Sequence, residues 1–207
     1  MLAHAVTDTN SPHVRPGSVA EHLGSDASDE TLVRLIAAGN REAMALLYAR
    51  HKTTVYRFIL RMTGNANTSD DLVSEVFLDV WRAAANFQAK SRVSTWLLAI
   101  ARYKTLSLTR RRADELWDER AAAAVEDGAD DPETTVDRLT RGAVVRNCLT
   151  RLSPVHRQVM DLAYYHERTV EEIATILDIP INTVKTRMFY ARSRMNHLLR
   201  QAGIDGA

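Results

Sequence analysis

The segment Arg168–Met195, RTVEEIATILDIPINTVKTRMFYARSRM, decides the fold prediction because it has the pattern of a helix-turn-helix. Apolar residues recur at helical spacing from Val170 to Leu177, and Thr169 stands where an N-cap residue is expected. Pro180 disfavours helical backbone at the residue before it, so the helical pattern is expected to break just there. The stretch therefore predicts two helices joined by a short turn.

The second helix of this motif is expected to start at Asn182 or Thr183 and to place a cationic face outward. A helix held to a small core by its inner side, with a polar and basic outer side, fits the major groove of duplex DNA. An ordinary amphipathic surface helix is the alternative, but the short turn and the sign of the charge favour DNA binding. The predicted inward residues are Val184, Met188, Ala191 and Met195, and the outward residues are Lys185, Thr186, Arg187, Phe189, Tyr190 and Arg192.

The distribution of charge along the 207 residues is more informative than the formal net charge of +1. Residues 93–112 contain five basic residues and no acidic residue, and residues 141–200 contain ten basic and five acidic residues. Between these blocks, residues 113–139 contain ten acidic and two basic residues. Two basic blocks separated by an acidic connector are typical of a chain with two nucleic-acid-binding modules.

The remaining composition excludes several classes of protein. The one cysteine, Cys148, excludes an internal disulfide framework and a cysteine-rich zinc cluster, and its place on an apolar stripe predicts a buried, inert thiol. His156, His166 and His197 do not have the spacing of metal ligands and are expected at the surface or as capping groups. No apolar run approaches the roughly 20 residues that span a bilayer, and the first residues lack the pattern of a secretory signal. We therefore expect a soluble, cytoplasmic protein without membrane insertion, metal or cofactor.

Helical periodicity without sustained strand alternation predicts an all-α protein with two small helical domains. Residues 1–28 are rich in Ser, Pro, His, Asp and Gly, so they are expected to form a disordered N-terminal extension. Residues 113–139 offer few large apolar side chains, so they are expected to form a flexible acidic linker, with at most a short helix near residues 116–125. The expected first domain spans residues 29–112, and the expected second domain spans residues 140–202.

Four helices are expected in the first domain from the apolar pattern and from the polar or glycine residues that flank it. The first begins near Asp29, the second runs from about Arg41 to about Met62 and ends before Gly64, the third is capped by Ser69 or Asp70, and the fourth runs from about Val93 to about Arg111.

Two parts of this chain resemble the sigma-70 family of RNA polymerase sigma factors. DLVSEVFLDVWRAAANF (Asp71–Phe87), STWLLAIAR (Ser94–Arg102) and the basic run Arg110–Arg112 resemble sigma domain 2. The segment Leu149–Met195, which contains the predicted helix-turn-helix, resembles sigma domain 4. Two such domains and no others are the pattern of the extracytoplasmic-function (ECF) subfamily. The resemblance implies a non-enzymatic factor that directs core polymerase to promoters, in a stress or environmental response.

The resemblance also implies where the polymerase binds. The helix that follows Asp70 is implied to dock on the clamp of the largest polymerase subunit, and the helices from Val144 to Tyr165 are implied to meet the flap of the second-largest subunit. The carboxylates on the first of these helices are spaced at i, i+4 and i+8, so they share one face. No nearby histidine or glycine-rich phosphate loop supports metal binding or catalysis on that face. The implied polymerase-binding residues are Asp71, Glu75, Phe77, Asp79 and Trp81.

The loop Phe87–Ser94 and the helix after it are implied to read the promoter −10 element on the non-template strand. Capture of a single strand needs a cationic track for phosphates and platforms for unstacked bases. Many relatives have glycine where Ala89 stands and asparagine where Tyr103 stands, and an aromatic ring cannot copy the paired hydrogen bonds of an amide. Trp96 is expected to pack in the core. The implied −10 residues are Phe87, Lys90, Arg92, Arg102, Tyr103 and Lys104.

The predicted recognition helix is implied to bind the −35 element as a duplex. The resemblance further implies an anti-sigma partner, and we expect the free protein to be a monomer. A helix-turn-helix regulator that acts as a dimer at operators is the alternative function, and a hydrolase or metal enzyme is a more distant one because no nucleophile–base or ligand cluster is present. The implied −35 residues are Asn182, Thr183, Lys185, Thr186, Arg187, Phe189, Tyr190 and Arg192.

Overall fold

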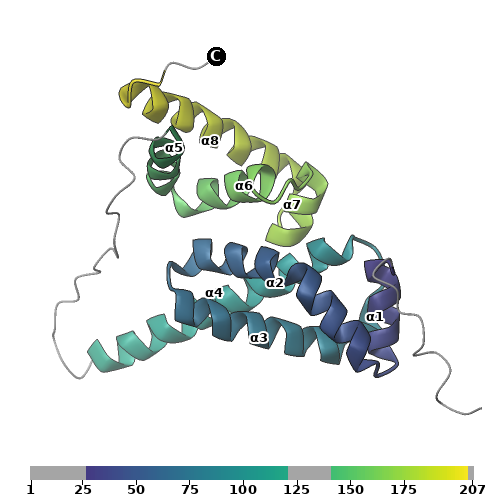
Figure 1. The fold of residues 1–207 in the computed structure, drawn as a ribbon. Helices are drawn as coiled ribbons and strands as arrows, with labels where there is room; N and C mark the ends of the chain where they lie inside the picture. The colour runs from purple at the N-terminus through teal and green to yellow at the C-terminus, as the bar shows by residue number, and fades with distance from the viewer. Residues whose placement is uncertain (1–26, 121–140, 205–207) are drawn as a thin grey trace, which may run out of the picture.

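The structure is a computed structural model that describes residues 27–120 and 141–204. All regular structure in these two ranges is helical, which confirms the all-α prediction. The helices form two groups that follow each other along the chain, one coloured purple to teal and one coloured green to yellow in Figure 1. Most of the predicted N-terminal extension and residues 121–139 of the predicted linker lie outside the described residues.

The first group is held together by apolar side chains that recur at helical spacing on four α-helices. Phe58, Leu32, Leu47 and Leu97 are among its largest fully buried side chains. The elements of this group are α1 (Asp29–Ala37), α2 (Arg41–Thr63), α3 (Ala66–Ala83), a short 3-10 helix (Ala84–Asn86) and α4 (Val93–Arg120).

Short polar side chains and glycine set most helix ends in this group. Ser28 Oγ accepts a hydrogen bond from the Thr31 N–H at 3.2 Å, and Asn40 Oδ1 accepts one from the Ala43 N–H at 2.9 Å. The helix α2 ends at Gly64, whose φ of 67° is a left-handed conformation that glycine adopts without strain. The predicted end of this helix is therefore confirmed.

The start of α3 differs from the prediction. The helix begins at Ala66 because Asn65 Oδ1, and neither Ser69 nor Asp70, accepts a hydrogen bond from the N–H of Thr68 at 2.9 Å. The Ser69 hydroxyl instead donates to the Asn65 carbonyl at 2.6 Å, inside the helix. Asn, Ser and Asp are all good N-cap residues, and the prediction considered only the two later ones, so it missed the first turn of the helix.

The end of α4 also differs from the prediction. The helix continues past Arg111 to Arg120, so the first residues of the predicted linker are helical. Residues 113–120, ADELWDER, contain neither glycine nor proline, and alanine, leucine, glutamate and arginine all favour helix. Their lack of a continuous apolar stripe is what made them resemble a linker in the sequence.

The second group is a compact set of four helices. Leu162, Ile173 and Leu198 are among its fully buried side chains, and Cys148 is a buried free thiol, as predicted. The helices of this group are α5 (Arg141–Thr150), α6 (Pro154–Tyr164), α7 (Val170–Leu177) and α8 (Ile181–Gln201).

The predicted helix-turn-helix is confirmed as α7 and α8. Thr169 and Glu172 form a capping box: the Thr169 hydroxyl accepts from the Glu172 N–H at 3.2 Å, and the Glu172 carboxylate accepts from the Thr169 N–H at 3.0 Å. Asp178 ends α7 in a left-handed conformation with φ of 50°. The helix α8 begins at Ile181, one position before the predicted start, directly after Pro180.

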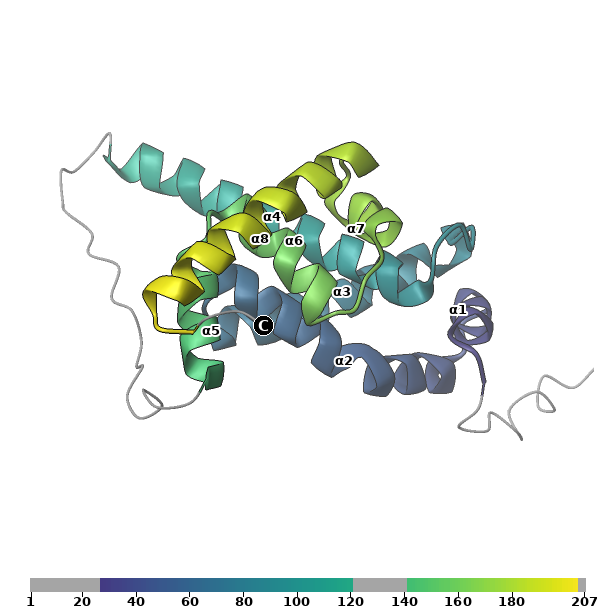
Figure 2. The same cartoon turned by 90° about the horizontal axis from the view of Figure 1, so that it is seen from above.

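The two helical groups touch each other. The helix α7 lies against α4, and Figure 1 shows it on the side of its own group that faces the first group; in Figure 2, seen from above, the second group overlies the first. A second contact joins α6 and the turn after it to α2, where Arg61 on α2 and Asp161 on α6 form an ion pair at 2.7 Å. His166, which the sequence placed at the surface or at a helix end, is buried at this second contact with 7% of its area exposed. The sequence does not show which side chains meet across two groups of helices.

Candidate nucleic-acid interfaces

The outer face of α8 combines exposed aromatic rings with cations. Phe189 is 67% and Tyr190 is 58% exposed, and their rings meet edge to face with centroids 5.5 Å apart. Lys185 and Arg192 are exposed on the same helix. Exposed rings of this size are uncommon on a solvated helix, whereas apolar groups beside cations suit thymine methyl groups, base edges and phosphates in a DNA groove.

The inner face of α8 fixes this surface in place. Val184, Met188, Ala191 and Met195 are all buried, as predicted. On the outer side, the Arg192 Nε donates a hydrogen bond to the Tyr164 hydroxyl at 3.0 Å. Tyr164 ends α6 and is 57% exposed, so it orients a predicted DNA contact from a neighbouring helix. The sequence analysis did not select it, since no local pattern links it to Arg192.

Some of the predicted −35 side chains are partly buried or already form a hydrogen bond within the protein. The Thr186 hydroxyl donates to the Asn182 carbonyl at 2.9 Å, which leaves its oxygen able to accept a bond from outside. Thr183 and Arg187 are half-buried, whereas Asn182 and Thr186 are exposed. The predicted residues therefore lie together on the first three turns of α8, with most of them on its solvent side.

Arg102 and Arg187, one from each predicted DNA-binding surface, lie near each other where the two groups meet. Burial lowers the pKa of the Arg102 guanidinium below its ordinary value, the negative charge of nearby Asp178 raises it, and the positive charge of Arg187 lowers it further. Within the described part of the chain, the buried Arg102 Nε has no hydrogen-bond partner. One residue of each predicted surface therefore lies within electrostatic range of the other.

The loop between the 3-10 helix and α4 carries the other predicted −10 residues. The rings of Phe87 and Trp96 lie 4.9 Å apart and are tilted by 38°, and both pack against the core, as predicted for Trp96. Ala89 adopts φ of 51°, a left-handed conformation in which glycine is favoured. Lys90 and Arg92 are exposed on this loop, and Tyr103 is 70% exposed on α4.

The predicted −10 residue Lys104 bridges two carboxylates of α3. Its Nζ lies 2.9 Å from Asp79 Oδ2 and 3.3 Å from Glu75 Oε2. The hydrogen bond to Asp79, and more weakly the bond to Glu75, raise the pKa of Lys104 although burial opposes them. Lys104 thus neutralises part of the acidic face of α3, a link between two predicted sites that spacing along the sequence cannot show.

The acidic face of α3 also contains exposed apolar groups. Leu78 is 54% and Trp81 is 37% exposed beside the exposed carboxylates of Asp71 and Glu75. Phe77, which was included in the predicted polymerase-binding set, is only 3% exposed and packs edge to face on Tyr48 with centroids 4.8 Å apart. Phe77 belongs to the core, and Leu78 takes its place on the face that a partner can reach.

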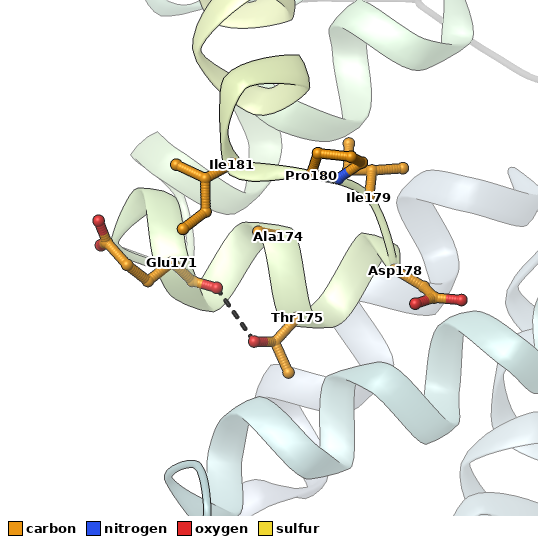
Figure 3. A pocket seen from close by; sticks show the side chains of 7 residues that line it. All are labelled: Glu171, Ala174, Thr175, Asp178, Ile179, Pro180 and Ile181. Carbon is orange, nitrogen blue, oxygen red and sulfur yellow. Dashed lines mark hydrogen bonds between the residues drawn. The ribbon is translucent and has the colours of Figure 1, made fainter.

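A shallow hollow follows the turn of the helix-turn-helix, as Figure 3 shows. The Thr175 hydroxyl donates to the Glu171 carbonyl at 3.1 Å beside it. The described residues contain no group of three or more His, Cys, Asp or Glu side chains that could hold a metal ion. No helix in the same residues is long and apolar enough to cross a membrane. The hollow is lined by Glu171, Ala174, Thr175, Asp178, Ile179, Pro180 and Ile181.

Comparison with known proteins gives the same division of the chain. Residues 47–115 match the family described as Sigma-70 region 2, and residues 143–195 match Sigma-70, region 4. The ECF RNA polymerase sigma factor SigK of Mycobacterium ulcerans (strain Agy99) is 34% identical over 161 residues, which are 76% of this chain and 86% of the relative. The ECF RNA polymerase sigma factor SigW of Bacillus subtilis (strain 168) is 28% identical over 178 residues, which are 81% of this chain and 95% of the relative.

Solved structures share the fold. CnrH, in complex with the cytosolic domain of CnrY, superimposes with a TM-score of 0.61 at 24% identity over 84% of this chain and 99% of that chain. The sigma factor RpoE, in complex with the anti-sigma factor NepR from Bartonella quintana, gives a TM-score of 0.59 at 24% identity over 74% of this chain and 94% of that chain. With both domains matched in order, the chain belongs to the ECF subfamily of sigma-70-type RNA polymerase sigma factors, a family of non-enzymatic initiation factors, and not to the dimeric helix-turn-helix regulators.

Proposed function

We propose that this chain binds core RNA polymerase as a monomer in the cytoplasm and directs it to promoters through their −10 and −35 elements. The observation that carries the proposal is the outer face of α8, where exposed cations and aromatic rings stand on a helix fixed by its buried inner face. The second domain holds the −35 element as a duplex, with Lys185 and Arg187 on base edges or phosphates and Phe189 on apolar base groups.

The first domain binds the −10 element on the loop before α4. Lys90 and Arg92 are exposed there and attract phosphates of a single strand, and exposed Tyr103 on α4 offers a stacking platform for an unstacked base. Ala89 in this loop has a left-handed backbone, Lys90 is exposed, and Arg92 is largely exposed although its Nε lies 3.8 Å from Glu172 Oε1. Lys104 acts differently from the predicted phosphate contact, since its charge is shared with Glu75 and Asp79.

The polymerase clamp docks on the face of α3 that carries Asp71, Glu75, Leu78 and Trp81. This face has two exposed apolar groups within a rim of charges, which is the composition of a protein-binding surface. An anti-sigma protein that covers the same face competes directly with the polymerase. Competition needs only overlapping surfaces, so it requires no metal or covalent change in this chain.

Transcription by reconstituted polymerase tests the proposal. The double variant Lys185→Ala/Arg187→Ala should lose initiation at a −35-dependent promoter, because each lost base contact costs about 1–3 kcal/mol. Its affinity for core polymerase should stay at the wild-type value, since both residues belong to α8 and neither belongs to the α3 face. Arg34→Ala, which removes an exposed cation of α1, is the control and should initiate normally. Wild-type initiation by the double variant would show that α8 is not the recognition helix.

A further inference from the structure

A cleft of about 190 Å³ lies between the second half of α2 and the turn that joins α6 to α7. Three arginines line it, and they are not part of the surfaces proposed above for promoter DNA or for the polymerase: Arg57 and Arg61 on α2, and Arg168 in the turn. The guanidinium group presents its N–H donors in a rigid fork that matches the oxygens of a phosphate or a carboxylate. A cleft with this lining is suited to an anion.

The α2 wall of the cleft contains two donor groups without partners. Thr54, Arg57 and Arg61 are spaced three and four residues apart, so they share one face of the helix. Arg57 is exposed, and its side chain forms no ion pair or hydrogen bond with any other described residue; the same holds for the Thr54 hydroxyl. Like charges four residues apart, such as Arg57 and Arg61, repel each other on a helix. An anion bound between them would offset that repulsion.

The other two guanidinium groups are already held in place. Arg61 Nη1 lies 2.7 Å from Asp161 Oδ1, and the Arg61 guanidinium stacks 4.1 Å from the centre of the Tyr165 ring. Arg168 Nη1 donates a hydrogen bond to the Ser94 hydroxyl at 2.8 Å. In the described part of the chain, Nη2 of both arginines forms no hydrogen bond, so it can donate to a ligand. Donors that are fixed before binding lose little conformational freedom when a ligand arrives.

Charge and size restrict the ligand. The acidic partners of the two held arginines, Asp161 and Glu172, have nearly buried side chains and do not line the cleft. Among the described residues that line it, only the exposed Glu167 is acidic, against three arginines. Pockets for drug-sized ligands begin at roughly 300 Å³, so a cleft of about 190 Å³ has room for a phosphate group and not for a whole nucleotide. The cleft therefore fits a small, highly charged anion.

We propose that this cleft is a binding site for one phosphate group, supplied by inorganic phosphate or by the terminal phosphate of a nucleotide whose remainder stays in solvent. Arg57 and Arg61 bind the phosphate oxygens from the α2 side, and Arg168 binds them from the opposite wall. The Thr54 hydroxyl donates a further hydrogen bond from α2. Because α2 and the turn before α7 belong to different helical groups, neither group contains the site alone.

Isothermal titration of the full-length protein with inorganic phosphate and with ATP tests this proposal, at an ionic strength held constant with chloride. Wild type should bind a single equivalent. Arg57→Ala should bind about tenfold or more weakly, because it removes hydrogen bonds from a charged donor. Glu167→Gln should bind about two- to fivefold more tightly, because it removes the acidic group that lines the cleft. Arg41→Ala, which removes an exposed α2 cation outside the cleft, is the matched control and should bind like wild type.

The two titrants distinguish the sources of the phosphate group. Tighter binding of ATP than of inorganic phosphate would identify a nucleotide, and equal affinities would identify the free ion. The proposal is overturned if neither titrant shows saturable binding, or if Arg57→Ala binds both as tightly as wild type. It is also overturned if Arg57→Ala weakens the binding of a single-stranded oligonucleotide alone, because Arg57 would then contact nucleic acid.

A second variant keeps the test independent of folding. If Arg57→Ala loses helical circular dichroism, Thr54→Val replaces it and should bind phosphate about two- to tenfold more weakly, because it removes only a hydroxyl donor. The titrations contain neither polymerase nor promoter. Failure of the proposed promoter function would instead appear as a wild-type protein that gives no promoter-dependent transcription with core polymerase.

Discussion

Glu172 accepts a hydrogen bond from the Thr95 hydroxyl at 2.9 Å while it also accepts one from the backbone N–H of Thr169 at 3.0 Å. The same carboxylate therefore caps its own helix and joins that helix to α4. Local helix stability and the contact between domains consequently depend on one titratable group. Protonation of Glu172 should therefore weaken the cap of α7 and the contact between the domains at the same time.

The pH dependence of stability follows from that charge. Burial alone would raise the pKa of Glu172, but hydrogen bonds from Thr169 and Thr95 and the charges of Arg168 and Arg92 outweigh it, so the pKa lies below its ordinary value of 4.5. A lowered folded-state pKa means that the stabilisation is complete above the ordinary value and is lost as the pH falls through the lowered one.

Urea unfolding over a series of pH values from about 6 to about 3 should therefore show a steeper loss of stability for wild type than for Glu172→Gln. Glu171→Gln, in the same first turn of α7 but exposed, is the matched control and should retain the wild-type slope. Equal slopes for wild type and Glu172→Gln would show that this carboxylate is not stabilised by folding.

Much of this architecture was predictable because its signals are local. The N-cap at Thr169, the break at Pro180 and the glycine that ends α2 each act within a few residues, and each was confirmed. The assignment of Phe77 to the docking face failed although the pattern was available. Phe77 lies four residues after Val73, on the buried stripe of α3, whereas Leu78 lies off that stripe.

Other features could not be predicted from the sequence because they depend on distant parts of the chain. Lys104 lies 25 residues or more from its acidic partners, and nothing local distinguishes it from a cation that contacts phosphate. The pairing of Arg61 with Asp161 and the burial of His166 arise only when the two domains meet. The composition of the sequence predicted two basic modules, but it did not predict which residues of one module contact the other.

The variant Lys104→Met should show whether Lys104 on α4 has a structural role or binds DNA. Loss of the bridge leaves Glu75 and Asp79 without the cation they share, and only the more distant Arg82 remains 3.7 Å from Asp79, so stability should fall by about 0.5–1 kcal/mol. Affinity for core polymerase should weaken with it, because the two carboxylates lose the group that positions them. Lys90→Met, in the exposed loop, should instead weaken −10 binding and leave stability and core binding unchanged. The reverse pattern in these two variants would assign Lys104 to DNA.

Replacement of Ala89, the left-handed residue in the −10 loop, by glycine should change the stability of the protein. Ala89→Gly should raise the free energy of unfolding by up to about 1 kcal/mol, because φ of 51° is unfavourable for alanine and relief of that strain exceeds the added chain entropy. Ala85→Gly, in the neighbouring 3-10 helix, has no such strain to relieve and should be destabilising. Thermal unfolding of both variants measures these changes. A lower stability of Ala89→Gly than of wild type would contradict the claim that the backbone at Ala89 is strained.

Tyr164→Phe should weaken binding to a −35 duplex by about two- to fivefold, since it deletes the acceptor that orients Arg192. Tyr165→Phe is the natural control, because the Tyr165 ring meets Arg61 through its face and keeps that contact without the hydroxyl. Fluorescence anisotropy with labelled duplex measures both. Identical affinities for the two variants would mean that the Tyr164 hydroxyl does not orient Arg192 for DNA binding.

The continuation of α4 to Arg120 sets how far the second domain can travel. Its last eight residues span about 12 Å as helix, where an extended chain of that length would span about 27 Å. The chain from Arg120 to Arg141 can stretch no further than about 75 Å. The second domain is thus confined to a bounded volume around the helix tip, which gives it a high effective concentration once the first domain is bound. The length of α4 and of the chain that follows it therefore sets an upper limit on the distance between two DNA segments that one molecule could hold at the same time.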